Sequence, residues 1–75
     1  MIVRDEKYII EFGKNLRKLR KSKNITQEKL AFSIGIEISQ ISRIERGIVN
    51  TSISTVKAIS DSLKIDIKEL FDFEY

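Results

Sequence analysis

The sequence predicts an all-α protein folded as a compact bundle of five helices. Apolar residues recur at spacings of three and four along almost the whole chain, as in helices that bury one face. Residues that favour helix starts precede several of these stretches, and glycines follow two of them. The sequence contains no proline and shows no linker, low-complexity segment or internal repeat. These observations favour helices throughout, organised as a single domain over residues 1–75.

The length and composition exclude several classes of protein. The chain has 75 residues, of which 41% are hydrophobic and 33% charged, as in a small globular domain. It contains no cysteine and no histidine, so we expect no disulfide, no metal site and no cofactor. No apolar stretch approaches the roughly 20 residues that span a bilayer, and the charged N-terminus does not suit a signal peptide. We therefore expect a cytoplasmic protein that gains stability by associating with a second copy.

The first three helices are defined by their apolar stripes and their ends. A helix over residues 5–22 carries four apolar residues at helical spacing, Ile9, Phe12, Leu16 and Leu19. A second helix begins after the cap residue Thr26 and ends at Gly35, which suits a left-handed conformation. A third helix covers residues 37–46 and stops at Gly47. Two short helices therefore flank a tight glycine turn.

The C-terminal third of the chain predicts two further helices. Asp66 and Glu69 have the spacing of a capping box inside a hydrophobic staple. A short fifth helix is therefore expected over residues 66–73. Before it, Ser52 can cap a fourth helix, whose buried face holds Val56, Ile59 and Leu63.

The third predicted helix presents a polar and cationic face. When Ile41 and Ile44 turn towards the core, the residues that point away from it are Ser39, Ser42, Arg43 and Arg46. Short hydroxyl side chains let a backbone approach closely, and arginine pairs bidentately with guanine in the major groove of DNA. On composition alone, a solvated surface with two arginines explains the pattern equally well.

Charge is unevenly distributed along the chain, whose net charge is +3. Residues 1–25 hold eight Lys and Arg against three Asp and Glu, whereas residues 51–75 hold three against five. This asymmetry favours an anionic partner for the N-terminal part of the molecule. A solvated basic helix face would produce the same balance.

Several of these residues occur together in a known arrangement. The segments are Thr26-Gln-Glu-Lys-Leu-Ala, Gly35, Ile41-Ser-Arg-Ile-Glu-Arg-Gly47, Asn50, Ser52 and Ile67-Lys-Glu-Leu-Phe71. The pattern, from about Phe12 to Phe71, resembles the Cro/repressor-type helix-turn-helix (XRE) family. The resemblance implies a lambda-repressor-like five-helix fold with its motif at residues 26–47. It also implies a bacterial or phage transcriptional regulator that binds palindromic operators as a homodimer.

The resemblance implies a set of DNA-contacting residues, Gln27, Ile38, Ser39, Gln40, Ser42, Arg43, Arg46 and Asn50. Gln27 matches the position that holds a phosphate at a helix N-terminus. Arg43 is the candidate for reading a guanine, with a phosphate contact as the alternative. Arg46 and Asn50 are expected at phosphates. Ile38 replaces the polar residue usual in the family; it would meet a thymine methyl if exposed, and it would only seal the turn if tucked in.

Two glutamates of the third helix are assigned structural roles. Glu45 faces the core on the helical wheel, where an unpaired carboxylate is costly, so it needs a cation. The resemblance supplies Arg20 of the first helix as its partly buried partner. Glu37 replaces the usual Ser or Thr cap, and phosphates would repel its carboxylate. We expect it to cap the third helix without touching DNA.

Apolar and aromatic residues concentrate at the C-terminus. A domain this small cannot bury all of them, so we expect a two-fold interface between copies along a C-terminal helix at residues 66–73. The expected interface residues are Ile67, Leu70, Phe71, Phe73 and Tyr75. The alternative is a disordered tail that begins at Phe73.

The sequence therefore predicts a regulator that binds double-stranded DNA and blocks or recruits RNA polymerase. Phage-type repressors and controller proteins of restriction–modification systems both fit this description. The alternative from another class is a protein-interaction module, such as an antitoxin that binds a partner protein while DNA binding is secondary. An enzyme is not expected, because no Ser, Lys or Asp stands at a spacing that makes a nucleophile–base pair.

Overall fold

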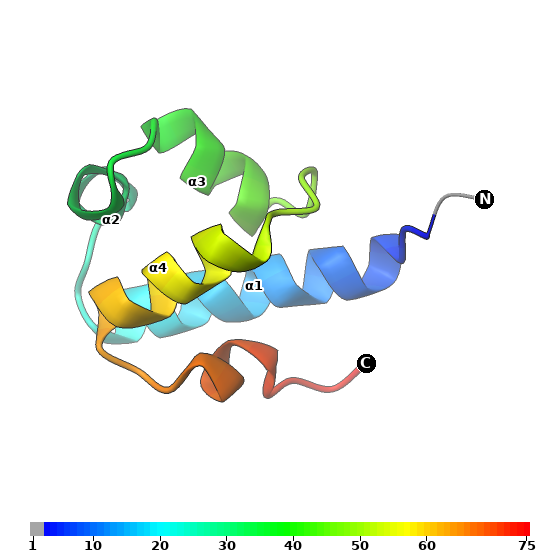
Figure 1. The fold of residues 1–75 in the computed structure, drawn as a ribbon. Helices are drawn as coiled ribbons and strands as arrows, with labels where there is room; N and C mark the ends of the chain where they lie inside the picture. The colour runs from blue at the N-terminus through cyan, green and yellow to red at the C-terminus, as the bar shows by residue number, and fades with distance from the viewer. Residues whose placement is uncertain (1–2) are drawn as a thin grey trace.

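The computed structural model describes residues 3–75, which form helices joined by short turns, with no strand among them (Figure 1). The elements are α1 (Glu6–Ser22), α2 (Gln27–Ile34), α3 (Ile38–Glu45), α4 (Ile53–Leu63) and a 3₁₀ helix, η1 (Ile67–Phe71). The all-α prediction is therefore confirmed. None of these helices is long and apolar enough to cross a membrane.

The helix ends follow from local hydrogen bonds at the predicted residues. The side chain of Thr26 accepts a hydrogen bond from the backbone N–H of Lys29, and Ser52 caps α4 in the same way. Asp5, which is not among the predicted caps, caps α1 by accepting a hydrogen bond from the backbone N–H of Tyr8. Gly35 adopts the expected left-handed conformation, with φ +77°, and ends α2.

The fifth predicted helix differs from the structure. The capping box between Asp66 and Glu69 is present, but residues 67–71 form a five-residue 3₁₀ helix and not an α-helix. The side-chain amide of Asn15 donates to the main-chain carbonyls of Glu69 and Leu70, at 2.9 Å each. These bonds from α1 satisfy carbonyls at the end of η1, and a segment this short gains little from further helical turns. Residues 3–75 therefore hold four α-helices and one 3₁₀ helix, and the predicted five-helix bundle is not matched.

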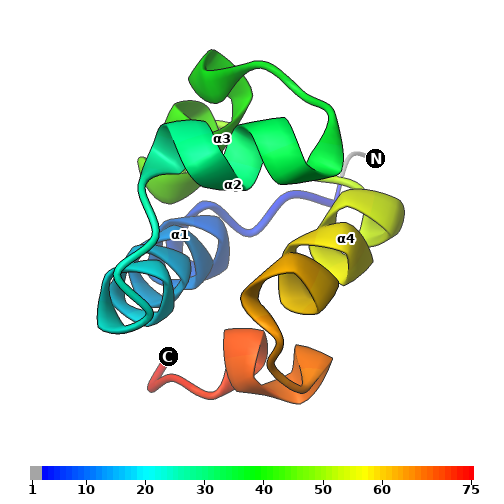
Figure 2. The same ribbon diagram turned by 90° about the vertical axis from the view of Figure 1, so that its left-hand side faces the viewer.

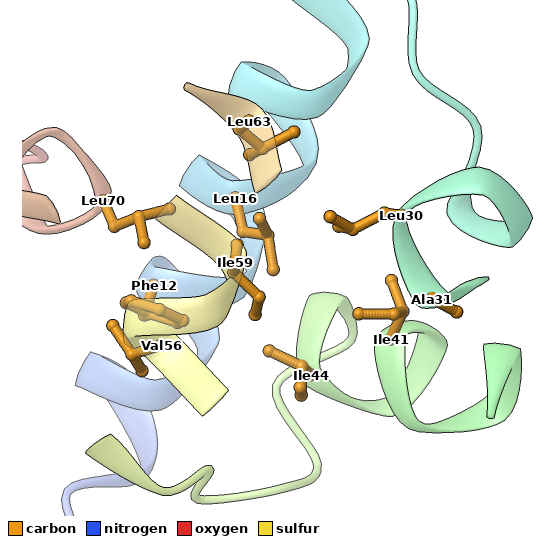
Figure 3. Close-up of a cluster of buried hydrophobic side chains, with 10 residues drawn as sticks. All are labelled: Phe12, Leu16, Leu30, Ala31, Ile41, Ile44, Val56, Ile59, Leu63 and Leu70. Carbon is orange, nitrogen blue, oxygen red and sulfur yellow. The ribbon is translucent and has the colours of Figure 1, made fainter. Parts of the chain in front are cut away.

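One apolar core joins all five elements, and Figure 3 shows its side chains pointing towards one another. The buried hydrophobic residues are Phe12, Leu16, Leu30, Ala31, Ile41, Ile44, Val56, Ile59, Leu63 and Leu70. The predicted inward faces of α3 and α4 are confirmed by this set. Because the core is small, each of these side chains carries a large share of the stability.

The helices are arranged in levels along one direction of the molecule. In both ribbon views α2 and α3 lie at one end, α1 and α4 lie in the middle, and η1 lies at the other end (Figures 1 and 2). Helix α3 packs on α1 and α2, and its remaining side is turned away from η1. The helix with the cationic face is therefore an outer element.

Two glycines let α3 approach α1 at backbone distance. A Cβ atom on Gly13 of α1 would lie 2.3 Å from the main-chain oxygen of Ile44 and 2.7 Å from that of Glu45. A Cβ atom on Gly47 would lie 2.6 Å from the Cα of Ile10. Neither gap holds a larger residue, so the C-terminal end of α3 rests directly on α1.

A buried ion pair fixes the same contact. Arg20 Nε lies 2.6 Å from Glu45 Oε2, and Arg20 Nη2 lies 3.0 Å from Glu45 Oε1. The two side chains are only 8% and 2% exposed. Arg20 Nη1 donates to the carbonyl of Ile25, and Gln27 Nε2 donates to Glu45 Oε1 at 2.9 Å. The pairing implied by the family resemblance is present, and through Gln27 it also engages α2.

The contact between α1 and α3 predicts that Gly13→Ala destabilises the protein. Alanine would ordinarily favour a helix by up to about 1 kcal/mol, but here its methyl group would overlap backbone oxygens that cannot rotate away. We expect a net loss of about 1–3 kcal/mol in the free energy of unfolding. Urea denaturation followed by circular dichroism measures it, with Lys18→Ala on the exposed side of α1 as control. A stabilised Gly13→Ala variant would contradict the close approach.

The ion pair predicts that Glu45→Ala is far more harmful than loss of a surface pair. It leaves the Arg20 guanidinium buried without its carboxylate, at a cost of about 3–5 kcal/mol. The control is Glu11→Ala, which removes the exposed bridge to Lys14 and should cost at most about 1 kcal/mol. Urea denaturation of both variants makes the comparison, and equal losses would show that the buried pair has no special role.

Candidate nucleic-acid interface

The outer face of α3 carries the polar residues that the sequence places there. Ser39, Gln40, Arg43 and Arg46 are exposed, and Ser42 is half-buried. Arg43 is exposed, and its guanidinium forms no hydrogen bond or ion pair with another of residues 3–75. The face therefore offers a free arginine beside small hydroxyl groups.

Two side chains of this face form hydrogen bonds with nearby backbone groups of α3 or of its N-cap residue. Gln40 Oε1 accepts from the backbone N–H of Glu37 at 3.3 Å, which links the first turn of α3 to its N-cap residue. Arg46 Nε donates to the carbonyl of Ser42 at 3.4 Å, a long and weak bond. Gln40 thus stabilises the start of α3, and Arg46 can release its bond at little cost.

Ile38 is the first residue of α3 and is exposed. Its side chain is 46% accessible, whereas Ile41 and Ile44 of the same helix are buried in the core. It is also absent from the hydrophobic residues that pack against the core. The alternative in which Ile38 is tucked in to seal the turn is therefore wrong.

Gln27 lies where α2 meets α3. It is the first residue of α2 and half-buried, and its Nε2 donates to the buried carboxylate of Glu45. A side-chain amide has a second N–H, so Gln27 keeps a donor for an acceptor outside the molecule. Its phosphate contact stays a prediction, but the bond to Glu45 fixes the direction of its amide.

The loop after α3 is held by a residue that sequence reasoning missed. Arg4 Nη2 donates to the carbonyl of Ile48 at 2.8 Å, and Arg4 Nε pairs with Glu6 at 2.6 Å. This ties the loop that contains the exposed Asn50 to the start of α1. No pattern of neighbouring residues predicts a hydrogen bond between residues that are 44 positions apart. Gly13, in contrast, could have been found, because a glycine inside an apolar helical stripe indicates a close backbone approach.

The predicted interface residues at the C-terminus divide into three groups. Leu70 is fully buried in the core, so its assignment to an interface is wrong. Phe73 and Tyr75 stack on Tyr8, with ring centroids 5.0 Å apart in each case, and the Tyr75 hydroxyl donates to Asp5. Ile67 and Phe71 are partly exposed and remain available to a partner.

An apolar groove of about 280 Å³ opens between α1, the start of α4 and η1. Its lining consists of Tyr8, Ile9, Phe12, Val49, Asn50, Thr51, Ile53, Val56, Ile67 and Phe71. Ile53 stands at this groove with 86% of its surface exposed. Ile53 is not among the predicted interface residues, because at the start of an amphipathic helix it looks like an ordinary member of the apolar stripe. The groove adds α4 to the region expected to bind a second copy.

The site offers hydrogen-bond donors and cations, and it offers no metal ligands. Among the residues that the structure describes, no group of three or more His, Cys, Asp or Glu side chains could hold a metal ion. Its exposed arginines and hydroxyl groups suit an anionic, hydrogen-bonding partner.

Comparison with known proteins agrees with this arrangement. The helix-turn-helix family model (HTH_3) matches residues 16–70, from within α1 to the end of the core. Control protein C.BamHI of Bacillus amyloliquefaciens is 44% identical over 63 residues, which cover 83% of this chain and 78% of that protein. The restriction-modification controller protein C.AhdI from Aeromonas hydrophila has a similar crystal structure, with a TM-score of 0.82 and 38% identity, over 84% of this chain and 96% of that one.

A further similar structure is that of the restriction-modification controller protein C.Esp1396I, a tetramer in complex with its natural 35 base-pair operator. It matches with a TM-score of 0.76 and 26% identity, over 91% of this chain and 100% of that one. The family match covers α2, α3 and the loop that follows, which are the elements of the candidate interface. The chain therefore belongs to the XRE-type helix-turn-helix family, a class of DNA-binding proteins that are not enzymes.

Proposed function

We propose that this protein is a transcriptional regulator that binds a palindromic operator in double-stranded DNA as a homodimer. The observation that carries the proposal is the outward face of α3, where the Arg43 guanidinium is free while the helix itself is held by a buried ion pair. C.BamHI and C.AhdI, named as control or controller proteins, support it. The operator complex of C.Esp1396I supports both the DNA partner and the multimer.

In this proposal residues 1–75 act as one DNA-binding domain with its motif at residues 26–47. Helix α3 enters the major groove with its N-terminal end towards the base edges. Arg43 pairs with a guanine, and Ser39 and Ser42 approach bases or phosphates. The N-terminus of α2, with Gln27, faces a phosphate, where the helix dipole favours an anion.

The dimer forms through the apolar groove and the residues at its edge. Ile53, Ile67 and Phe71 are exposed hydrophobic residues on adjoining elements, and a two-fold axis would place the same patch of both copies in contact. Such a dimer would present its two α3 helices to successive major grooves, about 34 Å apart. Phe73 and Tyr75 contact Tyr8, which lines the groove, and so adjoin this surface.

Binding of this kind needs neither a cofactor nor a metal ion. The protein would act in the cytoplasm, and its occupancy of the operator would block or recruit RNA polymerase. Because the operator would bind the dimer, the protein concentration that sets the amount of dimer would also set, by mass action, the amount of DNA-bound protein.

Selection of bound duplexes from a random pool tests the proposal, and two variants sort the contacts. We expect a symmetric consensus and an affinity that falls steeply with salt. Arg43→Ala should relax the preference at one base pair in each half-site, by about 1–3 kcal/mol per contact. Gln27→Ala should weaken binding to all sequences alike, because a phosphate contact carries no sequence information. Binding is measured by fluorescence anisotropy on consensus and scrambled duplexes.

Two results would refute this assignment. One is a flat response to salt together with no selected sequence. The other is stoichiometric capture of a partner protein by a chain that has no affinity for DNA, which is the behaviour of an interaction module.

The proposed dimer surface predicts that Ile53→Asp yields monomers. In a dimer, the aspartate of each copy would lose its hydration in an apolar contact near the same charge of the other copy. The folded monomer tolerates the aspartate because this position is exposed. Phe32→Asp is the matched control, since Phe32 is 87% exposed but lies on α2, away from the groove. Sedimentation equilibrium should show a dimer for the wild type and for Phe32→Asp. An Ile53→Asp protein that still dimerises would move the interface elsewhere.

A further inference from the structure

The α3 surface contains one apolar side chain among its polar ones. Ile38 opens α3 and is 46% exposed, next to Ser39 and one helical turn before Ser42. Ser39 and Arg43 form the parallel row, also one turn apart. The isoleucine thus belongs to the same continuous surface as the free arginine.

At the start of α3, Glu37 and Gln40 take part in the capping arrangement, and the side chain of Ile38 does not. Glu37 is the N-cap residue, and the Gln40 amide accepts a hydrogen bond from its backbone N–H. In a helix-turn-helix protein the first residues of the recognition helix come closest to the base edges. If the proposed function holds, Ile38 is therefore buried against DNA when the complex forms.

The chemistry of the major groove restricts what an isoleucine can meet there. Nearly every group on the base edges is a hydrogen-bond donor or acceptor, and covering one with a hydrocarbon costs its hydration without replacement. The one apolar group is the methyl on C5 of thymine. Cytosine acquires the same group when its C5 is methylated.

We propose that Ile38 is a specificity-determining residue that contacts the C5 methyl group of one pyrimidine in each operator half-site. In unmodified DNA that pyrimidine is thymine. The inference rests on the proposed function, and it assigns to Ile38 a preference that Arg43 and the serines cannot provide, because their contacts are polar.

The direct test removes only the methyl group. Each thymine of the selected duplex is replaced in turn by deoxyuridine, in both half-sites, and the affinity of the full-length chain is measured by fluorescence anisotropy. One symmetric position should lose about fourfold per methyl, or about sixteenfold for the two half-sites together. The other thymines should change little.

Variants of Ile38 assign this loss to the residue. Ile38→Ala should bind the thymine duplex as weakly as the wild type binds the deoxyuridine duplex, and should not distinguish the two. Ile38→Val, which keeps a branched apolar side chain, should retain most of the discrimination. Phe32→Ala, an exposed apolar residue on α2, is the control and should discriminate as the wild type does. Circular dichroism melting confirms that each variant is folded.

A second arm identifies the source of the methyl group. Each cytosine of the duplex is replaced by 5-methylcytosine; a gain of about fourfold per methyl that disappears in Ile38→Ala would make methylated cytosine the ligand. The inference is overturned if neither substitution changes affinity, or if Ile38→Ala keeps the same sensitivity as the wild type. In either case a selected consensus leaves the proposed function standing, whereas failure to select any duplex removes both.

Discussion

The position of α3 depends on one buried carboxylate. Glu45 receives two hydrogen bonds from Arg20 of α1 and one from Gln27 of α2, so three helices meet at a single group. Taking two charges out of water is costly, and such a pair contributes more to orientation than to net stability. Arg20 also donates to the carbonyl of Ile25, which adds the loop between α1 and α2 to the network. The network holds α3 against the other helices of the motif.

This network is possible because the backbones of α1 and α3 nearly touch. Gly13 and Gly47 leave room for that approach, and the contact positions the loop that follows α3. Arg4 then fixes this loop through the carbonyl of Ile48. Residues 49–51, which follow Ile48 in the same loop, line the apolar groove. The proposed surface for DNA and the proposed surface for a second copy are therefore joined by one loop that these contacts hold.

Local features of this fold could be predicted from the sequence, and distant contacts could not. The caps at Thr26 and Ser52 and the turn at Gly35 depend on residues a few positions apart. The wheel also placed Glu45 inwards, but only the family resemblance named its partner. The hydrogen bonds from Asn15 to η1 join segments far apart in sequence, so no local pattern reveals them. The local capping box alone predicts an α-helix at residues 66–73, where the structure has a 3₁₀ helix. The assignment of Leu70 to the interface is wrong because the spacing of apolar residues does not show which of them are fully buried.

Internal hydrogen bonds also limit how many side chains of α3 can read a sequence. The side-chain oxygen of Gln40 accepts a bond from the backbone N–H of Glu37, so Gln40 can offer a base only its amide N–H donors unless it gives up that bond. The uncommitted residues are few, and a good contact discriminates by only about 1–3 kcal/mol. One subunit therefore distinguishes sequences weakly. In a symmetric dimer the discriminating free energies of the two half-sites add, so the ratio between right and wrong sequences is squared. In the proposed dimer, association through the groove would then be a condition for specificity, which gives the exposed apolar surface around Ile53 a reason to exist.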